Sequence, residues 1–89
     1  MSAEERIDSH LIAVAFGRVL REIRRSRRIS QEELAERAGV DRTYPSMLER
    51  GVRAPGLPVA ISVAIALGVE PDGLVRTTVE RLRRQGVLP

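Results

Sequence analysis

Apolar residues recur at intervals of three and four along most of this chain, which is the spacing that predicts α-helices. Glycine, proline and capping residues interrupt the pattern at several points and divide it into separate helices. We therefore predict an all-α fold in which residues 1–89 form one domain of five helices. The expected helices cover residues 3–26, 31–38, 42–50, 58–67 and 71–85.

Residues 30–51 predict two short helices joined by a tight turn. Ser30 is a good N-cap, and Glu33, three residues later, completes a possible capping box, so the first helix is expected to start directly after Ser30. Gly39 can adopt the left-handed backbone that a sharp turn requires, and Asp41 is expected to cap the second helix. This is the helix-turn-helix arrangement, whose second helix lies in the DNA major groove.

Pro45 affects the start of the second helix of this motif. Proline lacks an amide hydrogen and disfavours helical geometry in the residue before it, here Tyr44. The helix therefore begins either after Asp41 with a distorted first turn, or later, at Tyr44 with Thr43 as its cap. In both cases Pro45 is expected to fill an apolar site near the end of the helix.

The first helix is predicted to be long, because an apolar stripe without proline runs from about residue 3 to residue 26, after a possible capping box of Ser2 and Glu5. Gly17 within it costs about 1 kcal/mol relative to alanine, which indicates close packing against a neighbouring helix. The helix at 58–67 is apolar nearly all round, so we expect it to be the central buried element.

The last helix is longer than a five-helix core needs. Its first turn is expected to complete the core, and its apolar stripe is a candidate dimer interface. The alternative is a helix folded back onto its own subunit. The stripe consists of Leu74, Val75, Thr78, Val79 and Leu82.

The composition excludes several classes of function. The chain has no cysteine and one histidine, so we expect no disulfide, no metal centre and no cofactor. No apolar run approaches the roughly 18 residues of a membrane span and the acidic N-terminus is not a signal peptide, so we expect no membrane association and a cytoplasmic location. The sequence contains no catalytic Ser/His/Asp set and no phosphate loop, which argues against an enzyme or a small-molecule ligand.

All 15 basic residues are arginine, and the net charge is +3. Arginine binds phosphates and guanine edges bidentately, which suits contact with nucleic acid, although a genome that favours arginine codons explains the bias equally well. Six arginines lie in residues 18–28 against a single acid, Glu22. This run is either a solvated helix face or a surface that attracts phosphates.

The chain resembles the phage-repressor (lambda-repressor-like, XRE) helix-turn-helix family over about residues 16–75. The matching motifs are Phe16-Gly17-x-x-Leu20-x-x-Ile23-Arg24, Ser30-Gln31-Glu32-x-Leu34-Ala35-x-x-Ala38-Gly39-Val40, Glu49-Arg50-Gly51, Pro55-x-Leu57, Ala66-Leu67-Gly68-Val69 and Leu74. Arg42-Thr43-Tyr44 followed by Glu49-Arg50-Gly51 is most similar to the controller proteins of restriction-modification systems. The resemblance implies a five-helix lambda-repressor-like fold, here with extended first and last helices.

The resemblance also implies which residues act. Arg24 and Glu49 would form a partly buried ion pair between the first and third helices. Arg42, Thr43, Ser46 and Met47 match positions that contact base edges, and Gln31, Tyr44 and Arg53 suit phosphates. The full set implied in DNA binding is Gln31, Arg42, Thr43, Tyr44, Ser46, Met47, Arg50 and Arg53.

Together these features predict a sequence-specific regulator of transcription that binds double-stranded DNA as a homodimer. A two-fold axis would place the two recognition helices about 34 Å apart, in successive major grooves of an inverted repeat. The alternative is an antitoxin-type module that neutralises a toxin and uses its DNA contact for autoregulation.

Overall fold

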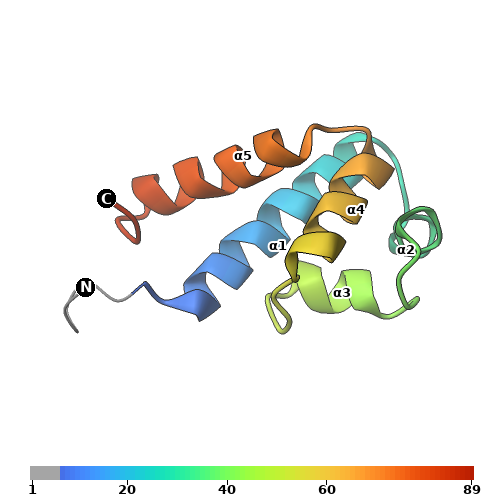
Figure 1. The fold of residues 1–89 in the computed structure, drawn as a ribbon, viewed down its shortest axis with the longest axis horizontal. Helices are drawn as coiled ribbons and strands as arrows, with labels where there is room; N and C mark the ends of the chain where they lie inside the picture. Colours follow the sequence, from blue (N-terminus) through green and yellow to red (C-terminus); the bar gives the residue numbers. More distant parts are fainter. Residues whose placement is uncertain (1–6) are drawn as a thin grey trace.

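The computed structural model describes residues 7–89, which form five α-helices and no strand (Figure 1). This confirms the all-α, five-helix fold. The helices are α1 (Ser9–Ser26), α2 (Gln31–Ala38), α3 (Tyr44–Glu49), α4 (Leu57–Leu67) and α5 (Pro71–Arg84).

Helix α1 begins later than the sequence pattern predicts. Ile7 and Asp8 are not helical, and the Asp8 carboxylate caps the helix by accepting hydrogen bonds from the amides of His10 at 2.9 Å and Leu11 at 3.2 Å. The prediction of one helix from residue 3 is therefore wrong, because an aspartate cap satisfies the free amides of the first turn at this point. The expected capping box of Ser2 and Glu5 lies outside the described residues.

The predicted bounds of α2 are confirmed. The Ser30 hydroxyl accepts a hydrogen bond from the Glu33 amide at 3.0 Å, and Gly39 ends the helix with a left-handed φ of 70°. The capping box is only half formed, because the Glu33 carboxylate pairs with Arg37 one turn along the helix.

The central element of the fold is α1, which lies between α5 on one side and α3 on the other (Figure 1). Helices α2 and α4 pack against each other and close the core around the second half of α1. Burying each large apolar side chain in this core contributes roughly 1.5–3 kcal/mol. The largest of its fully buried side chains are Leu20, Leu34, Leu48, Leu67, Leu74, Leu82, Val19, Val63 and Pro45.

Helix α4 is not the central buried helix that its composition predicts. One side of it, with Val63, Ala64 and Leu67, packs into the core. The other side leaves Leu57 and Ile65 72% and 66% exposed. We call the exposed group on α4 and the neighbouring α5, which consists of Leu57, Ile61, Ile65 and Val75, the apolar surface.

Helix α5 is folded back onto α1 of its own subunit. Leu74, Thr78 and Leu82 are buried in this contact, so the prediction that they form a dimer interface is wrong. These side chains already complete the core of the single chain, as the alternative expected. Val79 is half-buried, and Val75 is the exposed residue of the stripe.

No single helix among residues 7–89 is long and apolar enough to cross a membrane. Helices α4 and α5 reach the required length and composition only as a pair, which is bent by 104° at its break.

Helices α1 and α3 approach each other closely at Gly17. A methyl group at this position would lie 2.8 Å from the carbonyl oxygen of Glu49 and closer still to that of Leu48. The obstacle is backbone, which cannot rotate away as a side chain can. The unfavourable glycine predicted from the sequence is therefore what allows α3 to lie against α1.

We expect Gly17→Ala to lower the free energy of unfolding by about 2 kcal/mol or more, because the added methyl group overpacks a contact between two backbones. Gly73→Ala is the matched control, since its new methyl group would be 3.7 Å from its nearest neighbour. That change should raise stability by about 0.4–1 kcal/mol through the unfolded state. Urea unfolding measures both, and a Gly17→Ala protein as stable as the parent would contradict the close approach.

Candidate nucleic-acid interface

The turn between α2 and α3 is held by Asp41. Its carboxylate accepts hydrogen bonds from the Thr43 amide at 2.9 Å and from the Thr43 hydroxyl at 2.6 Å. These bonds hold the pKa of Asp41 below its ordinary value, so the carboxylate is ionised at neutral pH and loses this role only as the pH falls through that lowered pKa. Because Thr43 donates its hydroxyl to the turn, its methyl group is what remains for a ligand.

Helix α3 starts late, at Tyr44, with Thr43 as its cap. The expectation that Asp41 caps a helix beginning at residue 42 is therefore wrong, and the later of the two predicted starts is confirmed. Pro45 is buried in the first turn of α3, where a missing amide hydrogen leaves no hydrogen bond unmade. It fills an apolar site near a helix end, as expected.

Arg42 stands in the turn with its side chain 79% exposed. Its guanidinium lies 3.7 Å from the Glu32 carboxylate, and an ion pair this exposed contributes little, so the side chain is available to a ligand. Further along α3, Ser46 and Met47 are half-buried, while Arg50 is exposed and donates a hydrogen bond to the Ser46 carbonyl at 3.3 Å.

Tyr44 differs from its neighbours because its ring packs partly against the core. Arg53 lies beyond α3, in the loop to α4, and its side chain is exposed. The carbonyl oxygen of Met47 accepts hydrogen bonds from the amides of Val52 at 3.0 Å and Arg53 at 3.3 Å. The backbone at Arg53 is therefore tied directly to the end of α3.

A buried ion pair fixes α3 to α1. Arg24 donates to both carboxylate oxygens of Glu49, from Nε at 2.6 Å and from Nη2 at 3.0 Å. The exposed fractions are only 12% for the Arg24 side chain and 2% for that of Glu49. Burial of two charges is tolerated when their remaining hydrogen bonds are also made, and here Arg24 Nη1 donates to the Ile29 carbonyl at 2.8 Å.

Gln31 joins this pair from the start of α2. Its side-chain amide donates to Glu49 Oε1 at 3.1 Å, so α1, α2 and α3 meet at one carboxylate. Sequence reasoning missed this bond, the Arg24 bond to Ile29 and the Asp41 bond to the Thr43 hydroxyl. The polar residues around Asp41 gave a partial signal for its bond to the Thr43 hydroxyl. A bond to a backbone carbonyl, such as that of Ile29, cannot be predicted from residue type, because every residue has a carbonyl.

The structure thus gathers the predicted DNA-binding residues around α3. We call the surface that they form the reading face. From the turn, α3, the following loop and the start of α2, it comprises Arg42, Thr43, Tyr44, Ser46, Met47, Arg50, Arg53 and Gln31. Helix α3 lies along the lower side of the molecule in Figure 1, and α5 lies along the upper side.

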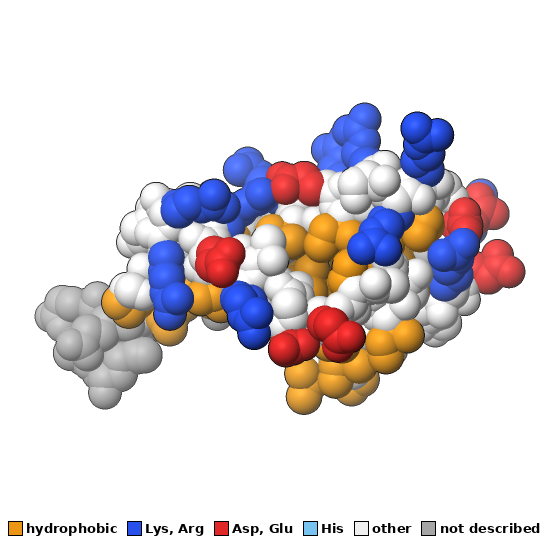
Figure 2. Space-filling model, turned by 90° about the horizontal axis from the view of Figure 1, so that it is seen from above, with side chains coloured by type: hydrophobic (Ala, Val, Ile, Leu, Met, Phe, Trp, Pro, Cys, Tyr) orange, Lys and Arg blue, Asp and Glu red, His pale blue; other side chains and the backbone are white. Residues whose placement is uncertain are grey.

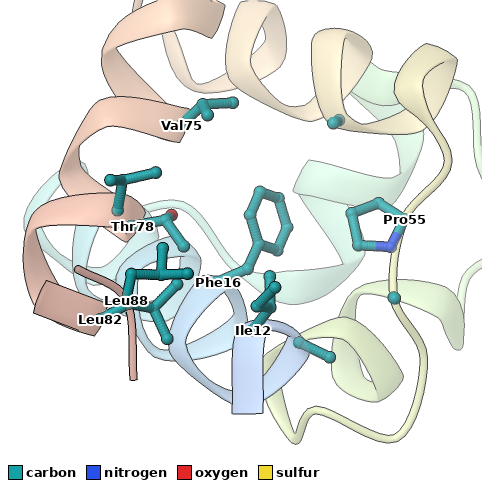
Figure 3. A pocket seen from close by; sticks show the side chains of 11 residues that line it. Ile12, Phe16, Pro55, Val75, Thr78, Leu82 and Leu88 are labelled. Carbon is teal, nitrogen blue, oxygen red and sulfur yellow. The ribbon is translucent and has the colours of Figure 1, made fainter. Parts of the chain in front are cut away.

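Beside the apolar surface the molecule is hollowed. A cavity of about 250 Å³ is formed between α1, α5 and the loop before α4, and Figure 3 shows Phe16, Pro55 and Val75 around it. The Thr78 hydroxyl donates to the Leu74 carbonyl at 2.9 Å, which leaves the cavity lining apolar. A smaller groove of about 210 Å³ between α4 and α5 shares Ala60 and Val75 with it.

Comparison with known proteins matches residues 20–74 to the helix-turn-helix family. Control protein C.BamHI of Bacillus amyloliquefaciens is 41% identical over 68 residues, which are 75% of this chain and 84% of that protein. The restriction-modification controller protein C.AhdI from Aeromonas hydrophila is 44% identical, with a TM-score of 0.68 over 70% of this chain and 94% of that one. The clp gene regulator ClgR from Corynebacterium glutamicum is 29% identical, with a TM-score of 0.78 over 84% and 80% of the two chains.

We expect Glu49→Gln to lower the free energy of unfolding by about 3 kcal/mol or more, because it leaves the buried Arg24 charge without its partner. Glu22→Gln is the matched control, since Glu22 pairs with Arg81 through similar distances but its side chain is 61% exposed. Removing that exposed charge should cost about 1 kcal/mol at most. Equal losses in urea unfolding would show that burial does not set the importance of the Arg24–Glu49 pair.

Proposed function

This chain belongs to the helix-turn-helix family of DNA-binding transcriptional regulators, and from this premise we propose that it binds one defined operator as a homodimer through the reading face. The observation that carries the proposal is the anchoring of α3. Its inner side is held by Glu49 in a buried ion pair, while Arg42 at its start is 79% exposed. A side chain presented from a turn that leads into a fixed helix can discriminate between bases, because the backbone that carries it is held in place before binding.

Arg42 is the proposed specificity residue. A guanidinium can donate to guanine O6 and N7 together, and such a pair discriminates by about 1–3 kcal/mol against other bases. Ser46 and Met47 follow on α3 and are proposed to contact base edges, Ser46 through its hydroxyl and Met47 against a thymine methyl group. The Thr43 methyl group, left outside the Asp41 hydrogen bonds, suits a second thymine.

The remaining residues of the reading face are proposed to hold the DNA backbone. Arg53 is exposed and its backbone is bonded to α3, so a phosphate contact there would set the depth of the helix in the groove. Tyr44 and Arg50 lie at the two ends of α3 and suit neighbouring phosphates. Gln31 has one amide hydrogen engaged by Glu49, and its second can reach a phosphate at the start of α2.

The apolar surface is the proposed dimer interface, in place of the buried stripe of α5. It carries exposed Leu57, Ile61 and Ile65 of α4, and the groove beside them can receive a side chain from a second copy. Figure 2 shows apolar side chains projecting along one edge of the molecule. Helix α4, which carries these three residues, lies in front of α1 in Figure 1. A two-fold axis there would leave both reading faces on one side, as an inverted repeat requires.

The role of a restriction-modification controller is the proposed biological setting. The two controller proteins are 41% and 44% identical to this chain, whereas the clp gene regulator is 29% identical. Control would then come from protein concentration, because dimerisation and operator binding both depend on it.

The proposal is tested by selecting the purified protein on a random duplex library. We expect an inverted repeat whose half-sites are about 10 bp apart, one turn of DNA. Arg42→Ala should relax selection at one base position in each half-site. Arg53→Ala should instead weaken all sequences equally and reduce the slope of log affinity against log salt by about 1 per subunit.

Selection that yields no repeat from folded protein would reject the operator. If both variants selected the parental sequence with the parental affinity, the assignment of the reading face would be wrong.

For the dimer, we expect Ile65→Glu to yield a monomer, because two buried carboxylates would face each other across the axis. The control is Leu11→Glu on α1, which is also an exposed apolar residue, at 42%, but lies outside the apolar surface. Sedimentation velocity gives the mass of each variant. A dimeric Ile65→Glu protein would place the interface elsewhere.

A further inference from the structure

The arginine residues of α1 point to different sides of the helix, one into the protein and others into solvent. Arg24 turns inward to Glu49, whereas Arg18, Arg21 and Arg25 are exposed and recur at intervals of three and four, which places them on one side of the helix. Arg84 of α5 joins them, since Arg18 and Arg84 line the same shallow depression between the two helices. We call these four residues the arginine face.

Within residues 7–89 the positive charge of the arginine face is only partly offset. Its neighbouring acid, Glu22, is already held by Arg81 through bonds of 2.8 and 2.6 Å. The hydrogen bond from Arg81, together with the charges of Arg81, Arg18 and Arg84, keeps the pKa of Glu22 below its ordinary value. Within residues 7–89 none of the four arginines of the face takes part in an ion pair.

Figure 2 shows several basic side chains along the upper edge of the molecule and others elsewhere on this view, while apolar side chains project from the lower edge. We take the arginine face to lie at the upper edge. If two subunits meet at the apolar surface, their arginine faces are directed outward along the DNA axis. Each would then stand above the duplex that continues beyond its own half-site.

The chemistry of this face fits one kind of partner. Four guanidinium groups without aromatic side chains between them match a row of phosphates, which binds arginine through charge and paired hydrogen bonds regardless of base sequence. Like charges held together also repel one another, and a polyanion relieves that repulsion. An acidic protein segment has the same sign of charge, but DNA is the ligand that this family binds.

We propose that the arginine face is a second DNA-backbone contact that binds the duplex flanking the operator and draws it toward the sides of the dimer. This inference rests on the proposed dimer at an operator. It adds a sequence-independent contact on α1 and α5 to the contacts of the reading face.

The test compares an operator duplex of about 20 bp with one of about 60 bp, since only the longer one reaches beyond both half-sites. A third duplex of about 60 bp carries the operator bases in shuffled order. Affinity is measured for each between about 50 and 200 mM salt. The face variant is Arg18→Gln with Arg25→Gln, and its control with the same charge change is Arg76→Gln with Arg83→Gln, two exposed residues of α5 outside the face.

The parent should bind the long operator with a steeper salt slope than the short one. The face variant should lose about 1.8 of that slope per subunit, or about 3.6 per dimer, so the affinity of the dimer for the long duplex falls about 150-fold less than the parent's over this salt range. On the short duplex it should match the parent. The Arg76 and Arg83 control should retain the parental salt slope on the long duplex, because these residues lie outside the arginine face. A face variant with lysine at positions 18 and 25 should also retain it, because contact with phosphates depends on charge.

Equal slopes for the parent and the face variant on the long duplex would overturn the proposal and would leave an acidic protein as the partner to examine. An equal loss on both operator duplexes would also overturn it, because the contact would then lie within the half-sites. The shuffled duplex distinguishes failure of this inference from failure of the proposed operator. If the protein has no sequence preference, the operator and shuffled duplexes of about 60 bp bind with equal affinity, yet the face variant still shows a reduced salt slope on both.

Discussion

The fold depends on one buried carboxylate, that of Glu49. Helix α3 has six residues and no side-chain cap, so it has little stability of its own and takes its position from what it packs against. Glu49 accepts hydrogen bonds from Arg24 and Gln31, which brings α1, α2 and α3 to one point. Because these bonds are directional, they fix the rotation of α3 about its axis, and with it the side chains that face outward.

The close contact at Gly17 makes this geometry possible. With no side chain at that position, α3 approaches α1 until the carbonyl groups of Leu48 and Glu49 lie against the helix. The carboxylate of Glu49 then lies within hydrogen-bonding distance of Arg24, which follows Gly17 further along α1. Pro45 acts at the other end of α3, where it fills the core and delays the start of the helix, so that Arg42 and Thr43 belong to the turn that Asp41 holds.

The outer surface has three sides of different chemistry. The reading face presents polar side chains on α3, the apolar surface presents exposed aliphatic groups on α4 and α5, and the arginine face presents excess positive charge on α1 and α5. A dimer that closes the apolar surface would align the other two with one DNA duplex. The exposure of Leu57 and Ile65 and the excess positive charge beside the Glu22–Arg81 pair thus acquire a common explanation in the proposed assembly.

Local pattern in the sequence was enough to determine the five helices, the cap at Ser30, the turn at Gly39 and the family, because periodicity, caps and motif spacing act over a few neighbouring residues. It left two starts open at Pro45, and only the packing of the proline decided between them. It also gave the wrong burial for α4 and the wrong role for the stripe of α5. The identity of an apolar residue does not show whether its side chain contacts the core, a second subunit or water. Which arginines of the run pair and which remain free was likewise decided by tertiary structure, because Glu49 and Arg81 lie 25 and 59 positions away along the chain from Arg24 and Glu22.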